Sequence, residues 1–314
     1  MKSMVLSRVA AVVALSCSVL VLTSCLARRR VITRNKTAPN QSLKTSNREL
    51  LLGVVQSEYE SIQALNATVD MVPAVGSVNK GKITEYKDVR AYILFKKPAE
   101  IRMIGLYPVV RNKAFDMVSN GADFRLFLPS KNQFIVGRND PAAAPSPKKM
   151  DNLRPSVFLD ALLIKPPDPK EFAVLTNITD EDDAVYILHI LYNGADGQLL
   201  PTRDIWFSRL TLHMIRQIMF DPKGNILTDA RYSDWKTYDG VQFPRVIDIN
   251  RPQDEYGVVI SVVKADINKP LSDSKFELEQ PEGTVLQVLD GKLAPQAATP
   301  ADASSASRKK KTAE

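Results

Sequence analysis

The sequence predicts a mainly β protein with α-helical elements. A curled antiparallel sheet forms an unclosed β-barrel, covered by an N-terminal helix and a short lid helix. Roughly a dozen segments with strand-like alternation follow one another along the chain, more than a flat open sheet carries comfortably. Their spacing leaves no room for helical crossovers, so neighbouring strands must run antiparallel. Two further segments have the apolar pattern of helices, which can cover the opening of the curled sheet.

The strand segments are separated by turn residues. Asn120-Gly121 is typical of a hairpin turn, and Pro98 lies in a turn at 96–99 between two strands. The run of four acids at 180–183 fits either a solvated hairpin turn, which we favour, or a cation site. We expect strands at 84–95, 100–104, 114–119, 124–128, 134–136, 172–177, 184–192, 204–207, 210–220, 226–235, 241–250 and 256–265.

The first helix is predicted near residue 46, where Ser46 and Glu49 fit a capping box, and it ends near Asn66. Its apolar residues recur at helical spacing and must cover a sheet. These residues are Leu51, Val55, Ile62 and Leu65.

The second helix is predicted over 156–164, and Pro166 and Pro167 end it. This segment is apolar almost all round, and a helix of that kind must be buried on more than one side. We interpret residues 157–164 as a lid over the curled sheet.

The first residues predict export. Lys2 and Arg8 precede an apolar stretch at 9–22, which is shorter than the roughly 20 residues that span a bilayer. The stretch ends in Leu-Thr-Ser-Cys at 22–25, which resembles the lipobox of bacterial lipoproteins and implies cleavage before Cys25 and lipidation of its sulfur. The alternative is an ordinary signal peptide with a chance cysteine.

The mature chain then contains Cys25 alone, because Cys17 is removed with the signal, so neither a disulfide nor a cysteine metal site is expected. The stretch after Cys25 carries Arg28, Arg29 and Arg30, which fit either attraction to anionic headgroups or a solvated linker. We expect a signal peptide at 1–24, a lipidated basic tether at 25–45, a β half-barrel domain at 46–290 and a disordered basic tail at 291–314.

The net charge of +7 comes from these ends of the chain. The signal contributes two positive charges, residues 26–47 contribute six, and the residues after 297 contribute a net two. Residues 48–297 therefore carry a net charge of −3. A body that is mildly acidic does not predict binding to nucleic acid.

No pattern of the sequence predicts catalysis or a cofactor. The chain lacks a Gly-x-Ser-x-Gly motif, a phosphate-binding glycine loop and a His-x-x-x-His pair. Both histidines, His189 and His213, lie within predicted strands among apolar neighbours, which favours buried, hydrogen-bonded roles over metal binding. We therefore expect a protein that is not an enzyme and has no metal site.

The predicted strands carry many apolar side chains, and two short helices can cover only part of the inner face that these side chains form. An inner face of this kind favours either an acyl-chain-sized cavity or an ordinary filled core, and the sequence leaves both open. Methionines among these residues suit varied apolar partners. The predicted cavity residues are Met71, Ile93, Phe95, Ile101, Met103, Phe115, Met117, Leu126, Phe158, Leu162, Leu212, Met214, Ile247 and Ile249.

An apolar hairpin tip at 105–110 is the other unusual feature. Leu106, Tyr107, Val109 and Val110 are unusual at a turn unless they dock on something. Contact with a membrane or protein partner and packing on the domain's own surface are equally compatible with the sequence.

Residues 48–282 resemble the LolA/LolB-like lipoprotein-carrier superfamily. The resemblance lies in a Lys-Pro … Arg strand-turn-strand pattern at 92–102, in Gly-Val-Gln-Phe-Pro at 240–244, and in Phe-Glu-Leu followed by Pro-Glu-Gly at 276–283. It implies an unclosed antiparallel barrel with a helical lid and an apolar cavity for lipid or acyl chains. A protruding apolar loop, here 106–110, is also implied. The Pro-rich stretch at 140–149 and the basic tail depart from that group.

Two functions follow from this interpretation. The first is a membrane-anchored carrier whose partners are the membrane, through the lipid on Cys25, and lipid or lipoprotein acyl chains. By analogy with sorting signals, Leu26 in place of an aspartate implies an outer-membrane anchor. The second is an envelope scaffold of the same fold that binds a protein partner and no lipid.

Overall fold

The computed structural model describes residues 42–77, 82–108, 110–139, 154–180 and 183–289. Cys25, the signal peptide, most of the predicted tether, Val109, the Pro-rich stretch at 140–149 and the basic tail lie outside these described residues. The chain divides into two compact units. One consists of 1–42 and 179–183; the other comprises the rest of the chain and contains the elements below.

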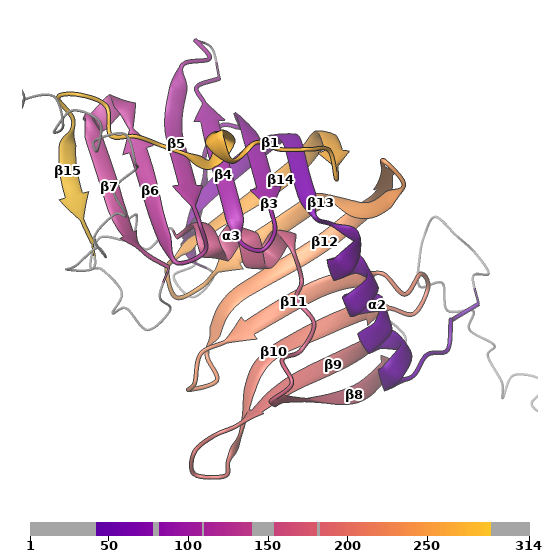
Figure 1. Cartoon of the computed structure of the whole chain (residues 1–314). Coiled ribbons are helices and arrows are strands. Elements are labelled where there is room, and N and C mark those ends of the chain that lie inside the picture. Colours follow the sequence, from indigo (N-terminus) through magenta and orange to yellow (C-terminus); the bar gives the residue numbers. More distant parts are fainter. Residues whose placement is uncertain (1–41, 78–81, 109, 140–153, 181–182, 290–314) are drawn as a thin grey trace, which may run out of the picture. The chain divides into compact units, whose positions relative to one another are not determined.

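Fifteen strands of the described chain form one sheet that does not close on itself (Figure 1). Its order is β15-β7-β6-β5-β4-β3-β1-β14-β13-β12-β11-β10-β9-β8, and β2 pairs with β1 outside this path. In chain order the strands are β1 (Ala64–Ser77), β2 (Lys82–Glu85), β3 (Val89–Lys96), β4 (Glu100–Leu106), β5 (Lys113–Ser119), β6 (Asp123–Leu128), β7 (Gln133–Arg138), β8 (Glu171–Thr179), β9 (Ala184–Asn193), β10 (Leu199–Ser208), β11 (Met214–Phe220), β12 (Ile226–Tyr238), β13 (Val241–Arg251), β14 (Tyr256–Ile267) and β15 (Val285–Val288).

The predicted fold class is confirmed. Successive strands form an antiparallel meander, and β1 joins its two halves by pairing with both β3 and β14. The sheet curves around the helices α2 (Arg48–Ser61) and α3 (Pro155–Leu162) (Figure 1). The hairpin between β5 and β6 turns at Asn120, whose side-chain oxygen accepts from the N–H groups of Ala122 and Asp123. Gly121 supplies the positive φ of 96° that this turn needs.

The first helix differs from its prediction at both ends. Asn47, not Ser46, is the N-cap, and its Oδ1 accepts from the Leu50 N–H at 2.9 Å. The backbone N–H of Ser46 instead donates to the Tyr186 hydroxyl. The helix ends at Ser61 because Ile62 is already extended, so Leu65 belongs to β1 and reaches the core from a strand.

Three strand predictions also need correction. The segment predicted at 84–95 consists of two strands, β2 and β3. Strand β2 pairs with β1, whereas β3 pairs with both β1 and β4. Strand β11 begins at Met214, not at 210, because Leu212 has a positive φ of 68° that interrupts an extended chain. Strand β15 was not predicted; it pairs in parallel with β7 and lies at one edge of the sheet.

Helix α3 is confirmed as a buried helix. Pro155 stands at its first turn, where a missing N–H costs nothing. It lies against the concave side of the sheet (Figure 1), and the adjoining Leu163 and Ile164 are buried as well. The buried apolar side chains of this segment are Val157, Phe158, Leu159, Ala161, Leu162, Leu163 and Ile164. They form one core cluster with α2 and the inner faces of the strands.

A second, smaller cluster lies on the other face of the sheet. Val118, Phe134 and Val136 pack there against Leu278 of the C-terminal segment. Arg102 fixes this segment, because its Nη1 donates to the carbonyl oxygens of Lys275 (2.9 Å) and Glu277 (3.2 Å). The C-terminal segment thus crosses strands β4 to β7 before it adds β15 to the sheet edge.

Candidate functional site

Twelve of the fourteen predicted cavity residues lie in the main core cluster. Phe115 and Leu212 pack against this cluster while partly exposed, and the others are buried. The structure brings these side chains together from both halves of the sheet and from α3. Two of them, Leu162 and Met214, line an unfilled space; the buried remainder contact one another in the core.

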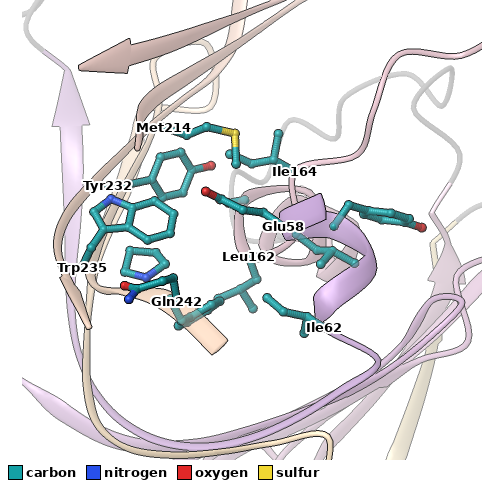
Figure 2. A pocket seen from close by; sticks show the side chains of 13 residues that line it. Glu58, Ile62, Leu162, Ile164, Met214, Tyr232, Trp235 and Gln242 are labelled. Carbon is teal, nitrogen blue, oxygen red and sulfur yellow. The ribbon is translucent and has the colours of Figure 1, made fainter. Parts of the chain in front are cut away.

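This unfilled space is a pocket of about 30 Å³ between the C-terminal parts of α2 and α3 and strands β11, β12 and β13. Figure 2 shows its side chains, with Glu58 entering from α2 and Tyr232 and Trp235 from β12. The lining residues are Glu58, Tyr59, Ile62, Ala161, Leu162, Leu163, Ile164, Met214, Tyr232, Trp235, Gln242, Phe243 and Pro244. A volume of this size holds about one or two water molecules and no lipid.

Glu58 is the acidic side chain of this otherwise largely apolar lining. Burial among apolar neighbours raises the pKa of Glu58 from an ordinary 4.5 to about 7. A substantial part of the Glu58 carboxyl is therefore protonated at neutral pH and can donate a hydrogen bond. The sequence carries a signal for this residue, since Glu58 follows Leu51 and Val55 and precedes Ile62 at helical spacing.

Tyr232 presents a buried hydroxyl to the same pocket. Its side chain is 4% exposed, and its Oη has no hydrogen-bond partner. Burial, together with the carboxylates of Asp160 and Asp229, raises the pKa of Tyr232 above its ordinary value of 10. In Figure 2 the hydroxyl points toward the side of the pocket that Glu58 enters.

Trp235 lines the pocket although it lies three residues after Tyr232 on the same strand. A regular strand would place these two side chains on opposite faces. The positive φ of Asp234, 53°, interrupts the alternation between them. This is why strand periodicity could not predict the pair. The Trp235 ring stacks on His213 at 4.8 Å with an interplanar angle of 8°.

A larger groove of about 620 Å³ lies between α2 and the segment that leads into β8, and it is open to solvent. Its lining combines the polar side chains of Arg48, Glu49 and Gln56 with apolar ones, among them Leu52, Pro166 and Phe172. Because this groove is wide open to solvent, it shields hydrocarbon from water less well than the smaller pocket within the core, which is the better candidate for an apolar ligand.

The predicted membrane or partner loop follows β4. Tyr107 is 39% and Val110 is 65% exposed, whereas Leu106 is partly buried and Val109 lies outside the described residues. The Tyr107 N–H donates to the Asn112 carbonyl, and the Arg111 N–H donates to the Tyr107 carbonyl. In its described part the loop is therefore a turn held by backbone hydrogen bonds, and it exposes Tyr107 and Val110.

The two histidines differ from their prediction in burial. His189 lies in β9 and is partly exposed; its Nδ1 lies 2.8 Å from Asp204 Oδ1 and its Nε2 lies 2.9 Å from Thr176 Oγ1. His213 precedes β11, and burial together with the charge of Lys44 lowers the pKa of His213. Neither the pocket nor the groove includes His189.

Within the residues that the structure describes, no group of three or more His, Cys, Asp or Glu side chains is able to hold a metal ion. Within the same ranges, no helix is both long and apolar enough to cross a membrane.

No protein-family model and no curated protein matches the chain. Solved structures resemble it at low sequence identity. A DUF1329 family protein from Desulfovibrio piger is 17% identical, with a TM-score of 0.48, and the match covers 72% of this chain and 94% of that one. A LolA superfamily protein from Nitrosomonas europaea is 14% identical, with a TM-score of 0.48 and coverage of 72% and 96%. A domain named for outer membrane lipoprotein sorting, from Vibrio parahaemolyticus, is 13% identical, with a TM-score of 0.48 and coverage of 73% and 97%.

Proposed function

We propose that this chain is a membrane-anchored, periplasmic lipid- or lipoprotein-binding protein whose curled sheet receives acyl chains beneath α3. One observation carries the proposal: an almost wholly apolar helix is buried against the concave face of an unclosed sheet. The seven apolar side chains of this segment, 157–159 and 161–164, are buried there. A helix that is apolar on all sides fits both a lid over apolar strands and a lid over bound hydrocarbon.

The lid must move for an acyl chain to enter. Ligand pockets enclose about 300–1,000 Å³, whereas the closed pocket measures about 30 Å³. Among the described residues, Gln217 donates to the Asp160 carbonyl of the lid segment, Arg203 donates to the carbonyls of Lys165 and Pro166, and Arg154 at the N-cap of α3 donates to the Arg138 carbonyl. Displacing α3 exchanges its apolar contacts for contacts with an acyl chain, which offsets much of the cost.

The proposal includes the anchor and the loop. Lipidation of Cys25 attaches the chain to the outer membrane, and the loop with Leu106, Tyr107, Val109 and Val110 touches a membrane or a donor protein. The supporting observations are the sequence Leu-Thr-Ser-Cys at 22–25 and the exposure of Tyr107 and Val110.

The filled interior favours a second candidate, an envelope scaffold that binds a protein partner and no lipid. Ile93, Met103, Ile247 and Ile249 have no exposed surface and pack into one cluster without a ligand. A core that is already packed is stable as it stands. Lipid uptake distinguishes this candidate from the carrier.

We expect Ala161→Leu to lower the affinity for cis-parinaric acid about tenfold, because the added side chain fills the pocket beneath the lid through which the acyl chain is proposed to enter. The measurement is a fluorescence titration of the full chain carrying Cys25→Ser, which removes the covalent lipid. Ala230→Leu is the matched control, since Ala230 is equally buried but does not line the pocket. Ile164→Phe fills the same pocket as a second variant. Folded Ala161→Leu and Ile164→Phe proteins with unchanged affinity contradict the carrier proposal.

We expect Tyr107→Glu to slow lipid transfer between donor and acceptor vesicles by about tenfold or more, because a charge at the exposed loop opposes its insertion among apolar groups. Thermal unfolding of the variant stays unchanged, since exposed substitutions cost little stability. Tyr192→Glu is the control, because Tyr192 is similarly exposed (43%) on β9. Equal transfer rates for the two variants contradict the role of the loop.

A further inference from the structure

Two residues that line the pocket carry a buried polar atom without a hydrogen-bond partner, the Tyr232 hydroxyl and the Trp235 Nε1–H. Leaving a buried hydroxyl without a hydrogen bond is unfavourable, so each such group in a native protein needs a reason. Phenylalanine would fill the same space without a hydroxyl, so packing alone does not explain why this residue is a tyrosine. Tyr232 faces the pocket that Glu58, Ile164 and Met214 also line, so a ligand atom placed there reaches its Oη (Figure 2).

The residues around this hydroxyl define the chemistry of its partner. The Tyr232 hydroxyl, the Trp235 Nε1–H and the protonated carboxyl of Glu58 can each donate a hydrogen bond, so a ligand with an acceptor oxygen satisfies them. Burial raises the pKa of Glu58 to about 7, so part of the Glu58 population carries this proton at neutral pH. The surrounding side chains, such as Ile62, Leu162 and Met214, are apolar, so the acceptor must be attached to hydrocarbon.

The acceptor must also be uncharged. None of the thirteen side chains that line this pocket is basic, so a phosphate or carboxylate would be buried without a counter-charge. The charged groups that raise the pKa of Tyr232 are the carboxylates of Asp160 and Asp229, and neither supplies a counter-charge for a buried anion. An ester carbonyl is an uncharged acceptor that every diacylglycerol-type acyl chain carries.

We propose that the pocket between α2, α3 and β12 binds the ester carbonyl of an acyl chain, with the Tyr232 hydroxyl and the Glu58 carboxyl as its two hydrogen-bond donors. This inference rests on the proposed function and adds to it a preference for ester-linked over ether-linked chains. The hydrocarbon then continues from the carbonyl into the apolar interior that α3 covers.

The test compares two lipids that differ only in this oxygen. The full chain carrying Cys25→Ser is titrated calorimetrically with 1-palmitoyl lysophosphatidylcholine and with its 1-O-hexadecyl ether analogue. We expect the ester lipid to bind about tenfold more tightly, the size of effect that one buried hydrogen bond gives. Tyr232→Phe lowers the affinity for the ester lipid to that for the ether lipid and leaves the ether lipid unchanged.

Tyr256→Phe is the matched control, because Tyr256 also carries a buried hydroxyl without a partner but does not line the pocket. We expect it to change neither affinity. Equal binding of the two lipids by the unsubstituted chain overturns the carbonyl site and leaves the carrier proposal standing, as does an equal loss of both lipids in Tyr232→Phe. Binding of neither lipid overturns this inference together with the proposed function.

Discussion

We expect Asp116→Ala to lower the free energy of unfolding by about 3 kcal/mol, the low end of the range for breaking a buried ion pair. Asp116 has no exposed surface and accepts from Arg102 Nε and Nη2, both at 2.9 Å, and from Lys113 Nζ at 2.7 Å. Its loss leaves the guanidinium of Arg102, only 16% exposed, without its carboxylate. The measurement is urea unfolding of the full chain carrying Cys25→Ser.

The effect also reaches the C-terminal segment. Arg102 donates to the carbonyls of Lys275 and Glu277, so releasing its side chain loosens the segment that covers the outer face of β4 to β7. Asp234→Asn is the control, because asparagine tolerates the positive φ of 53° at this position and the ion pair that it removes, with Arg245, is about 40% exposed; pairs of that kind contribute at most about 1 kcal/mol. Equal losses for the two variants contradict the burial argument.

We expect Glu58→Gln to raise the free energy of unfolding by about 2–3 kcal/mol at pH 8 and to change it little at pH 4. The pKa of Glu58 is about 7 in the folded chain and near 4.5 when exposed. Between these values the folded state holds more protons than the unfolded state, so stability falls as pH rises from about 4.5 to about 7 and is constant above. Glutamine removes this dependence because it does not ionise.

The measurement is the urea midpoint of both proteins across pH 4–9. Glu60→Gln is the control on the same helix, since Glu60 is exposed and its substitution should change stability by less than about 0.5 kcal/mol. A stability difference between Glu58→Gln and the unsubstituted chain that does not grow between pH 4.5 and 7 contradicts the burial of this carboxyl in the pocket.

The fold was predictable because its signals are local. Period-two alternation and turn residues such as Asn120-Gly121 mark each hairpin, and a meander needs no long-range information beyond that. The capping residue and end of α2 were wrong because the choice between Asn47 and Ser46 depends on Tyr186, which is distant in sequence. Strand β15 depends likewise on pairing with β7, about 150 residues away.

The site was predictable only in its apolar part. Periodicity placed residues such as Ile93, Met103 and Ile247 on the inner face, where the structure has them. It could not reveal which of them border open space, since that depends on how α3 packs. Trp235 was missed because the backbone at Asp234 breaks the strand alternation. Tyr232 was accessible, since it lies on the same strand face as the buried Ala230, and so was Glu58, as an acid on the apolar face of a helix.

The most direct test of the account is native mass spectrometry of the exported full chain carrying Cys25→Ser, followed by organic extraction. The substitution ensures that any lipid in the complex is bound without a covalent link. The account predicts an adduct of one acyl lipid per chain at near-stoichiometric amounts, which extraction releases. A mass without ligand, together with no uptake when 1-palmitoyl lysophosphatidylcholine is added, contradicts it and favours the scaffold with a filled core.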